Sequence, residues 1–239
     1  METKFKLVNS KPSQDFIEWN ELMSSNFDQD YYYERSNPFI VWVEKIRIIT
    51  IIDLIKKYIL LKNLSNPVIA EVGCGEGHVL KEIANKIQTK NLMGVDPLDG
   101  WLEKAKRKLN GSAKLLKGLT EDLPFESNFI DITICTEVLE HVIDPTVALK
   151  ELWRVMKQDG LLIISIPNEL LVNKLKNIIH SLKIYDLLFQ KIQKHNDWHI
   201  HSFDLTSFKK LIPGELKINS ISEIPLTSLP LRYVITFRK

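Results

Sequence analysis

The chain has 239 residues, of which 44% are hydrophobic and 26% are charged, so it is long enough to bury a substantial core. Its 32 Lys and Arg residues against 30 Asp and Glu residues give a formal net charge of +2, which excludes a nucleic-acid binder that works by overall charge. Two cysteines, Cys74 and Cys135, cannot build a disulfide framework or a structural zinc site, and they suit a reducing compartment.

The first predicted element is a long helix near the N-terminus. Residues 1–37 are polar and rich in aromatic side chains, and they show no clean period. From about Pro38 to Leu61 the apolar residues recur mostly three apart, which is typical of the buried face of a helix. The positions that predict this face are Ile40, Val43, Ile46, Ile49, Ile52 and Ile55. We therefore expect residues 1–64 to form an N-terminal helical cap and residues 65–239 to form the main domain.

Four β-prone runs follow, and helical stretches separate them. They are residues 68–72, 92–96, 130–135 and 161–166. The helix before the last run has Asp144 as its N-cap, Pro145 at its first position and Asp159-Gly160 as its stop. Strands that alternate with helices and are apolar on both faces predict a parallel sheet with helices on both sides. The chain ends in a short helix near 208–211 and two further strands, 216–224 and 231–237.

The first strand runs into a glycine-rich loop that extends to Gly77. Its sequence is Glu-Val-Gly-Cys-Gly-Glu-Gly, residues 71–77. Glycines let the backbone turn sharply and let a ligand approach without a Cβ in the way, at the carboxyl edge of a parallel sheet. A dinucleotide-binding loop needs a third small residue at position 78 or 80, and these positions hold His78 and Leu80. A nicotinamide-dependent oxidoreductase is therefore excluded, and a purely structural turn remains the alternative.

Two further segments suggest a nucleoside-containing ligand. Asp96 closes the second strand, where a carboxylate can hold both hydroxyls of an adenosine ribose. The alternative is that Asp96-Pro97 only starts a turn. Residues 118–125 come just before the next long strand, where they would flank an adenine.

The ordered set of motifs resembles the class I S-adenosylmethionine-dependent methyltransferases. The resemblance covers about residues 65–168 and is strongest for the small-molecule branch that includes the ubiquinone-pathway O-methyltransferases. It rests on residues 71–77, on Gly94-Val95-Asp96, on Leu123-Pro124-Phe125, and on Thr136-Glu137-Val138-Leu139-Glu140-His141 through to Gly160. Membership implies a Rossmann-like α/β fold: a seven-stranded, mostly parallel sheet in the order 3-2-1-4-5-7-6, with helices on both faces and an antiparallel last strand.

The resemblance also implies a cofactor, S-adenosyl-L-methionine, and residues that contact it. The loop glycines approach the methionine portion, Asp96 holds the ribose, Thr120 and Glu121 lie beside the adenine, and Thr136 lies below the methionine portion. Leu119 departs from the family, because many relatives have an acidic residue there, and this predicts an adenine contact through the backbone only. The predicted cofactor site comprises Glu71, Gly73, Cys74, Gly75, Gly77, Asp96, Pro97, Thr120, Glu121 and Thr136.

Methyl transfer from a sulfonium needs an aligned acceptor, exclusion of water and, for some acceptors, removal of a proton. His141 is the first candidate base, and holding the turn before Asp144 is an equal alternative for it. His199 or His201 is a second candidate base or a substrate contact, although histidines in such a loop are more often plain polar loop residues. On a helical turn, Glu137, Glu140 and His141 would share one face and could ligate a divalent cation, as this segment resembles that of some ubiquinone-pathway relatives.

Residues 169–203 are predicted to be a lid-like insertion over the acceptor. The basic, amphipathic part, 169–195, is either a lid helix with a solvated lysine face or a peripheral contact with an anionic membrane. The N-terminal aromatic side chains either cover the opposite side of the pocket or pack in the core. They are Tyr31, Tyr32, Tyr33, Phe39 and Trp42.

The sequence therefore predicts a methyltransferase that acts on a small molecule, at the oxygen of a quinone-like phenol, a sugar or a secondary metabolite. The alternative is a non-catalytic scaffold that keeps the methyltransferase fold. A nucleic-acid acceptor is not expected, because no basic domain or aromatic-basic stripe is present. No apolar run is long enough to span a bilayer and the charged N-terminus lacks a signal-peptide core, so we expect a cytoplasmic protein. The sequence leaves the oligomeric state open.

Overall fold

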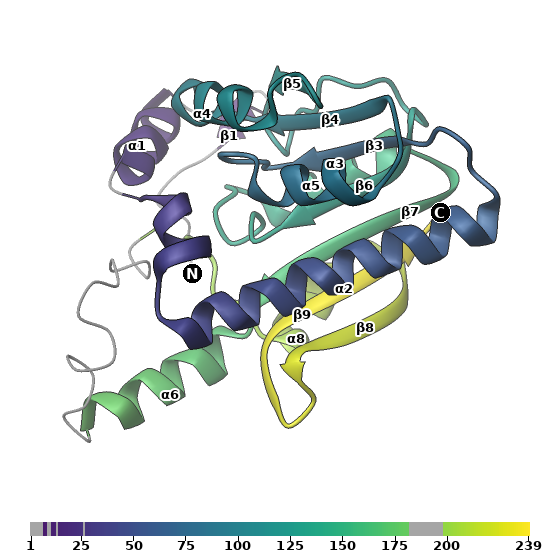
Figure 1. The fold of residues 1–239 in the computed structure, drawn as a ribbon. Helices are drawn as coiled ribbons and strands as arrows, with labels where there is room; N and C mark the ends of the chain where they lie inside the picture. The colour runs from purple at the N-terminus through teal and green to yellow at the C-terminus, as the bar shows by residue number, and fades with distance from the viewer. Residues whose placement is uncertain (1–6, 9–10, 13, 26, 182–197) are drawn as a thin grey trace.

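The computed structural model describes residues 7–8, 11–12, 14–25, 27–181 and 198–239 (Figure 1). A two-stranded hairpin comes first, followed by two helices and a π-helical turn. These elements are β1 (Leu7–Val8), β2 (Lys11–Pro12), α1 (Gln14–Ser25), η1 (Tyr31–Arg35) and α2 (Pro38–Lys62). Within the described residues, no helix combines the length and the apolar character that crossing a membrane requires.

A seven-stranded sheet forms the centre of the molecule. Its strands are β3 (Val68–Val72), β4 (Asn91–Asp96), β5 (Lys114–Lys117), β6 (Ile130–Thr136), β7 (Met156–Pro167), β8 (Lys217–Leu226) and β9 (Leu229–Arg238). The order across the sheet is β5-β4-β3-β6-β7-β9-β8, which is 3-2-1-4-5-7-6 in chain order. The ladders from β5 to β7 are parallel, whereas β9 runs antiparallel to both of its neighbours. The predicted topology is confirmed.

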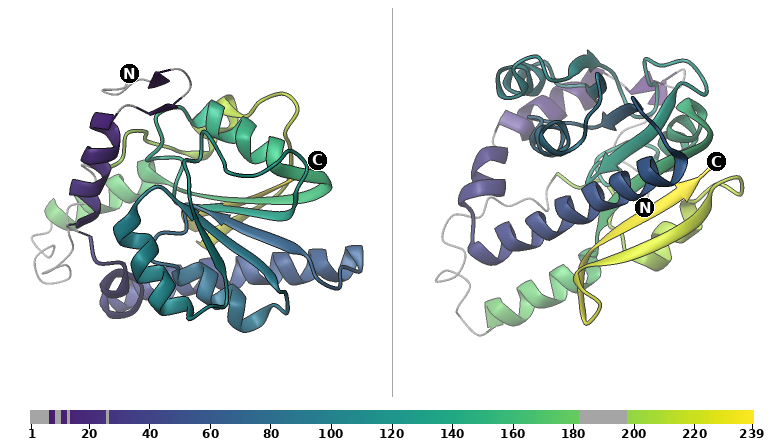
Figure 2. Two further views of the ribbon diagram at one scale, coloured as in Figure 1. Left: turned by 90° about the horizontal axis from the view of Figure 1, so that it is seen from above. Right: turned by 45° about the vertical axis from the view of Figure 1, so that its right-hand side comes forward.

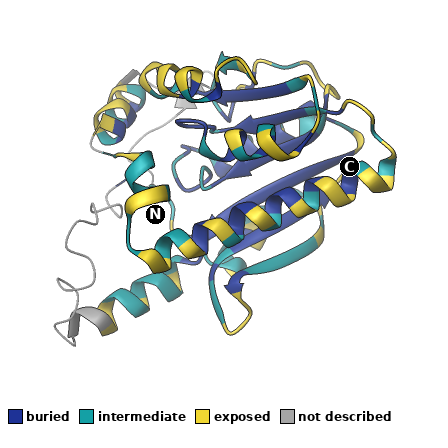
Figure 3. Cartoon of the chain, viewed as in Figure 1, coloured by how far each residue is buried: buried dark blue, intermediate teal, exposed yellow. Residues whose placement is uncertain are grey.

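Helices cover both faces of this sheet (Figure 2). They are α3 (His78–Lys86), α4 (Asp99–Leu109), α5 (Pro145–Val155), α6 (Glu169–Ser181) and α8 (Leu205–Leu211). Apolar side chains of α2, α3 and α4 share one buried cluster with the sheet, and those of α5 and α8 share a second. Strands β3, β4, β6, β7 and β9 are mostly buried, the edge strands β5 and β8 are mostly half-buried or exposed, and the helices alternate between buried and exposed positions (Figure 3). This is the burial that strands apolar on both faces predict.

The long helix α2 lies where the sequence predicts it, but its buried face differs from the expected one. The Asn37 side chain accepts a hydrogen bond from the backbone N of Phe39 at 2.9 Å, and Asn63 ends the helix in the left-handed conformation. Of the expected stripe, Ile49 is 54% exposed. A three-residue repeat drifts away from a helix face because an α-helix has 3.6 residues per turn. The buried positions instead keep the helical period: Val43, Glu44, Arg47, Ile48, Ile51, Ile52, Ile55 and Tyr58.

The helix α5 begins as predicted but ends early. The Asp144 carboxylate accepts hydrogen bonds from the backbone N of Thr146 and of Val147, at 2.9 and 3.2 Å. The predicted stop at Asp159-Gly160 is wrong, because α5 ends at Val155 and the chain enters β7 directly. Asp159, with φ of 62°, and Gly160 belong to the early part of β7, where its ladder with β6 shifts register. A positive φ therefore marks an irregular strand here and not a helix end.

The N-terminal elements α1, η1 and the start of α2 lie beyond the carboxyl ends of the strands, at the left of Figure 1. The guanidinium of Arg47, on α2, is fully buried and ties these elements to the sheet. It donates to Glu44 Oε2 at 2.7 Å, to the Tyr33 hydroxyl at 2.9 Å and to Ser165 Oγ of β7 at 3.2 Å. The ends of the sheet and the N-terminal elements are thus joined by one buried cation.

We predict that Arg47→Ala lowers the free energy of unfolding by about 3–5 kcal/mol, because it removes the nearer cation from a buried carboxylate. Urea unfolding followed by circular dichroism measures this. The matched control is Arg35→Ala, whose ion pair with Asp28 is exposed and whose loss we expect to cost less than about 1 kcal/mol. Equal losses in the two variants would contradict the role assigned to Arg47.

Candidate functional site

A cavity of about 390 Å³ lies at the carboxyl ends of β3, β4 and β6. The sheet forms its floor, and η1, α2 and the first turns of α6 contribute to its walls. Most of the predicted cofactor residues line it: Glu71, Gly73, Cys74, Asp96, Pro97, Thr120, Glu121 and Thr136. Gly75 and Gly77 do not, although they belong to the loop that borders it. The structure therefore brings together residues from four separate segments of the sequence.

The glycine-rich loop folds back over the end of β4. The backbone N atoms of Gly73 and Cys74 donate to the carbonyl of Val95, at 2.8 and 3.0 Å. Gly73 has φ of 73°, and a Cβ at this position would lie 2.2 Å from Cγ2 of Val138. Only glycine fits both the conformation and the space, which leaves bare backbone facing the cavity.

Asp96 is buried and joins this loop to the start of α4. Its Oδ2 accepts from the backbone N of Gly75 at 2.9 Å, and its Oδ1 accepts from that of Leu98 at 3.0 Å. Burial raises the pKa of Asp96 to about 6, while the two backbone hydrogen bonds oppose the rise. The Asp96 carboxylate therefore holds the turn that Asp96-Pro97 starts, which is one of the two roles considered from the sequence. It also lines the cavity, where a ligand could reach it.

Glu71 is the second buried carboxyl group of the cavity floor. Its Oε2 has no hydrogen-bond partner within the described part of the chain. Burial raises the pKa of Glu71 to about 8, even though the Arg47 guanidinium and a hydrogen bond from Thr136 lower it. A buried oxygen without a partner is costly, so a cationic or hydrogen-donating ligand group would stabilise this site.

The loop that is predicted to flank an adenine forms another part of the wall. Thr120 and Glu121 are both buried, and Leu119 lines the cavity beside them. Glu121 Oε1 accepts from the backbone N of Ile143 at 2.9 Å, and burial raises the pKa of this carboxyl group. Glu121 thus fixes the loop to the turn that precedes α5.

The turn after β6 does not have the helical geometry that the sequence predicts. Glu137 has φ of 53°, which is incompatible with a right-handed helical turn. Its carboxylate accepts from Ser165 Oγ at 2.8 Å and pairs with Nε of Arg232 at 2.7 Å. As a result, Glu140 and His141 are grouped with His199 rather than with Glu137. The expectation of one shared helical face is wrong for this reason.

The walls opposite the sheet are aromatic. Tyr32, Tyr33 and Phe39 line the cavity as one interpretation of the sequence predicts, whereas Tyr31 and Trp42 do not. The other aromatic lining residues were not identified from the sequence, since no periodic pattern marks them: Phe16, Phe27, Trp101 and Trp198. The Trp198 indole N donates to Asn20 Oδ1 at 2.9 Å, which joins the C-terminal end of the insertion to α1.

The insertion contributes to the cavity through its two described ends. Glu169, Val172 and Lys176 of α6 line the cavity from one end of the insertion, and His199 lines it from the other. Residues 182–197, which include His195 and most of the basic part of 169–195, lie outside the described residues. The choice between a lid helix and a membrane contact therefore stays a prediction.

The sheet order and the glycine loop at its carboxyl edge together define a class I methyltransferase fold. The comparisons with known proteins agree. Residues 70–164 match the methyltransferase domain family. The chain is 32% identical over 104 residues to YrhH of Bacillus subtilis, covering 42% of this chain and 58% of that protein. It is 33% identical over 101 residues to the ubiquinone/menaquinone biosynthesis C-methyltransferase UbiE of Campylobacter jejuni, covering 40% and 43%.

Among solved structures, the chain shares its fold with magnesium protoporphyrin IX methyltransferase from Synechocystis, which was solved with bound S-adenosylhomocysteine. The TM-score is 0.64 at 17% identity, over 92% of this chain and 96% of that one. The chain spans about half the length of the curated relatives that it matches. Its fold is that of the class I S-adenosylmethionine-dependent methyltransferases, and its similarity to a ubiquinone-pathway enzyme is confirmed over residues 70–164 and their surroundings.

We predict that Gly73→Ala destabilises the chain by about 2–4 kcal/mol, because it adds a clash with Val138 to the cost of a left-handed conformation. The control is Gly111→Ala, since Gly111 has φ of 83° but nothing within 4 Å of an added Cβ. We expect that variant to lose only about 1–2 kcal/mol. Urea unfolding of both variants measures the difference, and equal losses would show that close packing at Gly73 is unimportant.

Proposed function

We propose that this chain transfers a methyl group from S-adenosyl-L-methionine to a small-molecule acceptor. The observation that carries the proposal is that the buried carboxyl groups of Glu71 and Asp96 line one cavity beside the bare backbone of Gly73. A cationic nucleoside supplies hydroxyl groups, an ammonium group and a sulfonium, which are the groups that such carboxylates bind. The S-adenosylhomocysteine in the Synechocystis structure supports the same cofactor.

Each predicted cofactor residue has a role in this proposal. Asp96 accepts hydrogen bonds from the ribose, and Glu71 accepts one from the ammonium group of the methionine portion. Thr120 and Glu121 flank the adenine, whose amine we expect to meet backbone groups, since Leu119 offers no carboxylate. The remaining predicted residues shape the backbone and floor beneath the cofactor: Gly73, Cys74, Gly75, Gly77, Pro97 and Thr136.

Methyl transfer depends more on aligning the acceptor with the methyl group and on excluding water than on acid catalysis. The thioether that leaves the sulfonium is already a good leaving group and needs no proton. The aromatic walls keep water away from the methyl group and hold a flat acceptor against it. His141 lines the cavity, and its Nδ1 lies 3.3 Å from the carbonyl oxygen of Trp198. We propose His141 as the group that takes a proton from the acceptor, with His199, at 4.8 Å between ring centroids, beside it.

The acceptor that we propose is an aromatic or quinol-like small molecule methylated at oxygen. Its flat ring suits the tyrosine, phenylalanine and tryptophan side chains around the cavity. The names of the relatives, a ubiquinone/menaquinone C-methyltransferase and a magnesium protoporphyrin IX methyltransferase, agree with a small planar acceptor. A nucleic-acid acceptor is not part of the proposal, and we expect the reaction to take place in the cytoplasm.

Calorimetric titration of S-adenosylmethionine and S-adenosylhomocysteine tests the cofactor site. We expect micromolar binding by the wild type, weakened by about 1–3 kcal/mol in Asp96→Ala, which leaves the ribose hydroxyls unpaired. The control is Asp99→Ala, which removes an exposed carboxylate three residues further along the chain, in the first turn of α4, and should bind like the wild type. No binding by a folded sample at millimolar cofactor would overturn the proposal. Binding without transfer of labelled methyl to any phenol or quinol tested would favour the non-catalytic scaffold.

We also predict that the affinity for the cofactor rises as the pH increases from 6.5 to 7.5. A group whose pKa is about 8 is mostly protonated at pH 6.5, and each unit of pH toward 8 raises its ionised fraction up to about tenfold. A cationic ligand prefers the ionised form, so we expect binding about 3–10 times tighter at pH 7.5 than at pH 6.5. Glu71→Gln should reduce this ratio to less than about 2. An unchanged pH dependence in Glu71→Gln would show that Glu71 does not contact the cofactor.

A further inference from the structure

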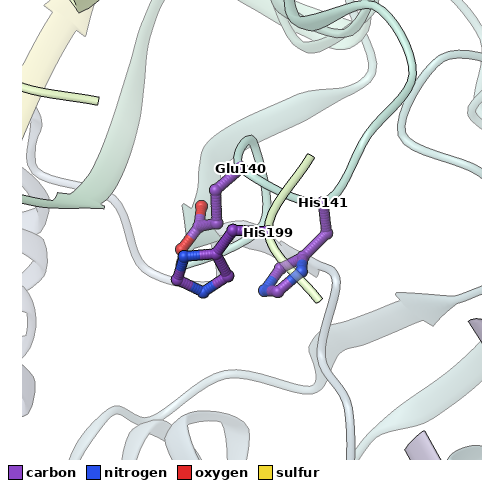
Figure 4. A group of neighbouring side chains, drawn as sticks. All are labelled: Glu140, His141 and His199. Atoms are coloured by element: carbon purple, nitrogen blue, oxygen red, sulfur yellow. The ribbon is translucent and has the colours of Figure 1, made fainter. Parts of the chain in front are cut away.

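One face of α6 lines the cavity over about two helical turns. Its lining residues lie at positions i, i+3, i+4 and i+7, which share one side of a helix: Glu169, Val172, Asn173 and Lys176. The hydrogen bond between Glu169 and His199 fixes the start of this face beside the carboxyl and imidazole groups drawn in Figure 4. Lys176 ends the face, about 10 Å further along the helix axis.

Lys176 is half-buried, although a lysine on an amphipathic helix normally extends its ammonium group into water. Lys174, two residues earlier, is exposed and follows this rule. Lys176 instead lines the cavity, as does Arg232 of β9. Burial and the Arg232 guanidinium lower the pKa of Lys176, and the attraction of Glu169 does not reverse the shift. Two cations therefore repel each other within one cavity, and a bound anion would reduce that cost.

The carboxylates that line this part of the cavity are engaged by other groups. Glu137 pairs with Nε of Arg232 at 2.7 Å, and Glu44 Oε1 lies 3.5 Å from Nη2 of the same arginine. The third carboxylate, Glu169, is hydrogen-bonded to His199. These contacts match the charge of Arg232 and hold it in place. The Lys176 ammonium group is therefore the cation of this wall for which a ligand carboxylate would add the most attraction.

We propose that Lys176, with Arg232 beside it, binds a carboxylate of the acceptor, so that the molecule methylated is an aromatic acid. A single negative charge suits the wall better than a doubly charged phosphate, because Glu137 and Glu44 already match the charge of Arg232. The aromatic side chains of the cavity hold the ring between the two ends of the acceptor. That this acid is the methyl acceptor rests on the proposed function, whereas its binding does not depend on methyl transfer.

The position of Lys176 limits the length of such an acid. The helix rises about 10 Å between Glu169 and Lys176, and side chains of a helix tilt back toward its N-terminus, which shortens the distance. The reacting hydroxyl group beside His141 and the carboxylate beside Lys176 should therefore lie about 6–10 Å apart in the acceptor. Phenols that carry a carboxylate directly on the ring, or through one or two carbon atoms, cover this range.

Calorimetric titration of three matched pairs of ligands into the full chain, with and without S-adenosylhomocysteine, tests the carboxylate site. Each pair is a phenolic acid and its neutral primary amide. The acids are 3,4-dihydroxybenzoate, 3,4-dihydroxyphenylacetate and 3,4-dihydroxycinnamate. We expect at least one acid to bind about 10-fold or more tightly than its amide, because a charge-assisted contact with an ammonium group is strong in a partly buried site.

Substitutions on α6 show which lysine is responsible for this preference. Lys176→Gln should reduce the ratio of the two affinities to less than about 2, because it removes the charge. Lys176→Arg keeps the charge and should keep the ratio within about threefold of the wild-type value. The matched control is Lys174→Gln, which removes an exposed lysine from the same helix and should leave the ratio unchanged. Circular dichroism of every variant checks that it is folded.

Titration of S-adenosylmethionine into the same samples separates failure of this proposal from failure of the proposed function. Equal affinities of acid and amide in all three pairs, or no binding of any acid at millimolar concentration, would overturn the carboxylate site. An acid preference that Lys176→Gln retains would overturn it too. If the cofactor still binds in these cases, the proposed function stands. A preference that depends on Lys176 in a chain that binds no cofactor supports the carboxylate site and contradicts the proposed function.

Discussion

The rest of the site depends on two arginines, the fully buried Arg47 and the partly buried Arg232, which join the N-terminal elements to the end of the sheet. Arg47 binds Glu44, Tyr33 and Ser165, and Arg232 pairs with Glu137 at 2.7 Å while its Nη2 donates to the Tyr32 hydroxyl at 3.1 Å. Such a network is stabilising only while each member keeps its partners, because a single unpaired charge in it costs several kcal/mol. It therefore fixes one position of η1 and α2 over the carboxyl edge, and this position makes the walls of the cavity.

The same network determines which way the turn after β6 points. Glu137 is held by Ser165 of β7 and by Arg232 of β9, and it takes a left-handed conformation there. The chain must then reverse its path, so that Glu140 and His141 lie on the side of His199. The carboxylate of Glu137, which the sequence suggests as a metal ligand, thus holds the turn in place. By doing so it positions Glu140 and His141 further along the turn.

Much of the fold could be predicted from the sequence because its signals are local. The Asp144 cap, the glycine loop and the β-prone runs each depend on residues a few positions apart, and their order implies the sheet topology. The strand β5 was not identified from its residues, because a four-residue edge strand with half-buried leucines carries little periodic signal. The arginine network could not be predicted either. Its contacts join residues 118 and 200 positions apart, Arg47 to Ser165 and Arg232 to Tyr32, and no pattern in one sequence encodes such pairs.

The two histidines of His199-Ile200-His201 show how backbone placement separates residues that look alike in the sequence. The backbone N atoms of Ile200 and His201 both donate to the Glu140 carbonyl, which fixes the segment against the turn. His201 is directed to the carbonyl of Val142 at 2.9 Å, so its ring is used in holding the turn together. His199 lines the cavity and is oriented by Glu169 of α6. The structural contacts of His201 therefore hold the segment so that His199 lines the cavity, and hydrogen bonds join this segment both to α6 and to the turn after β6.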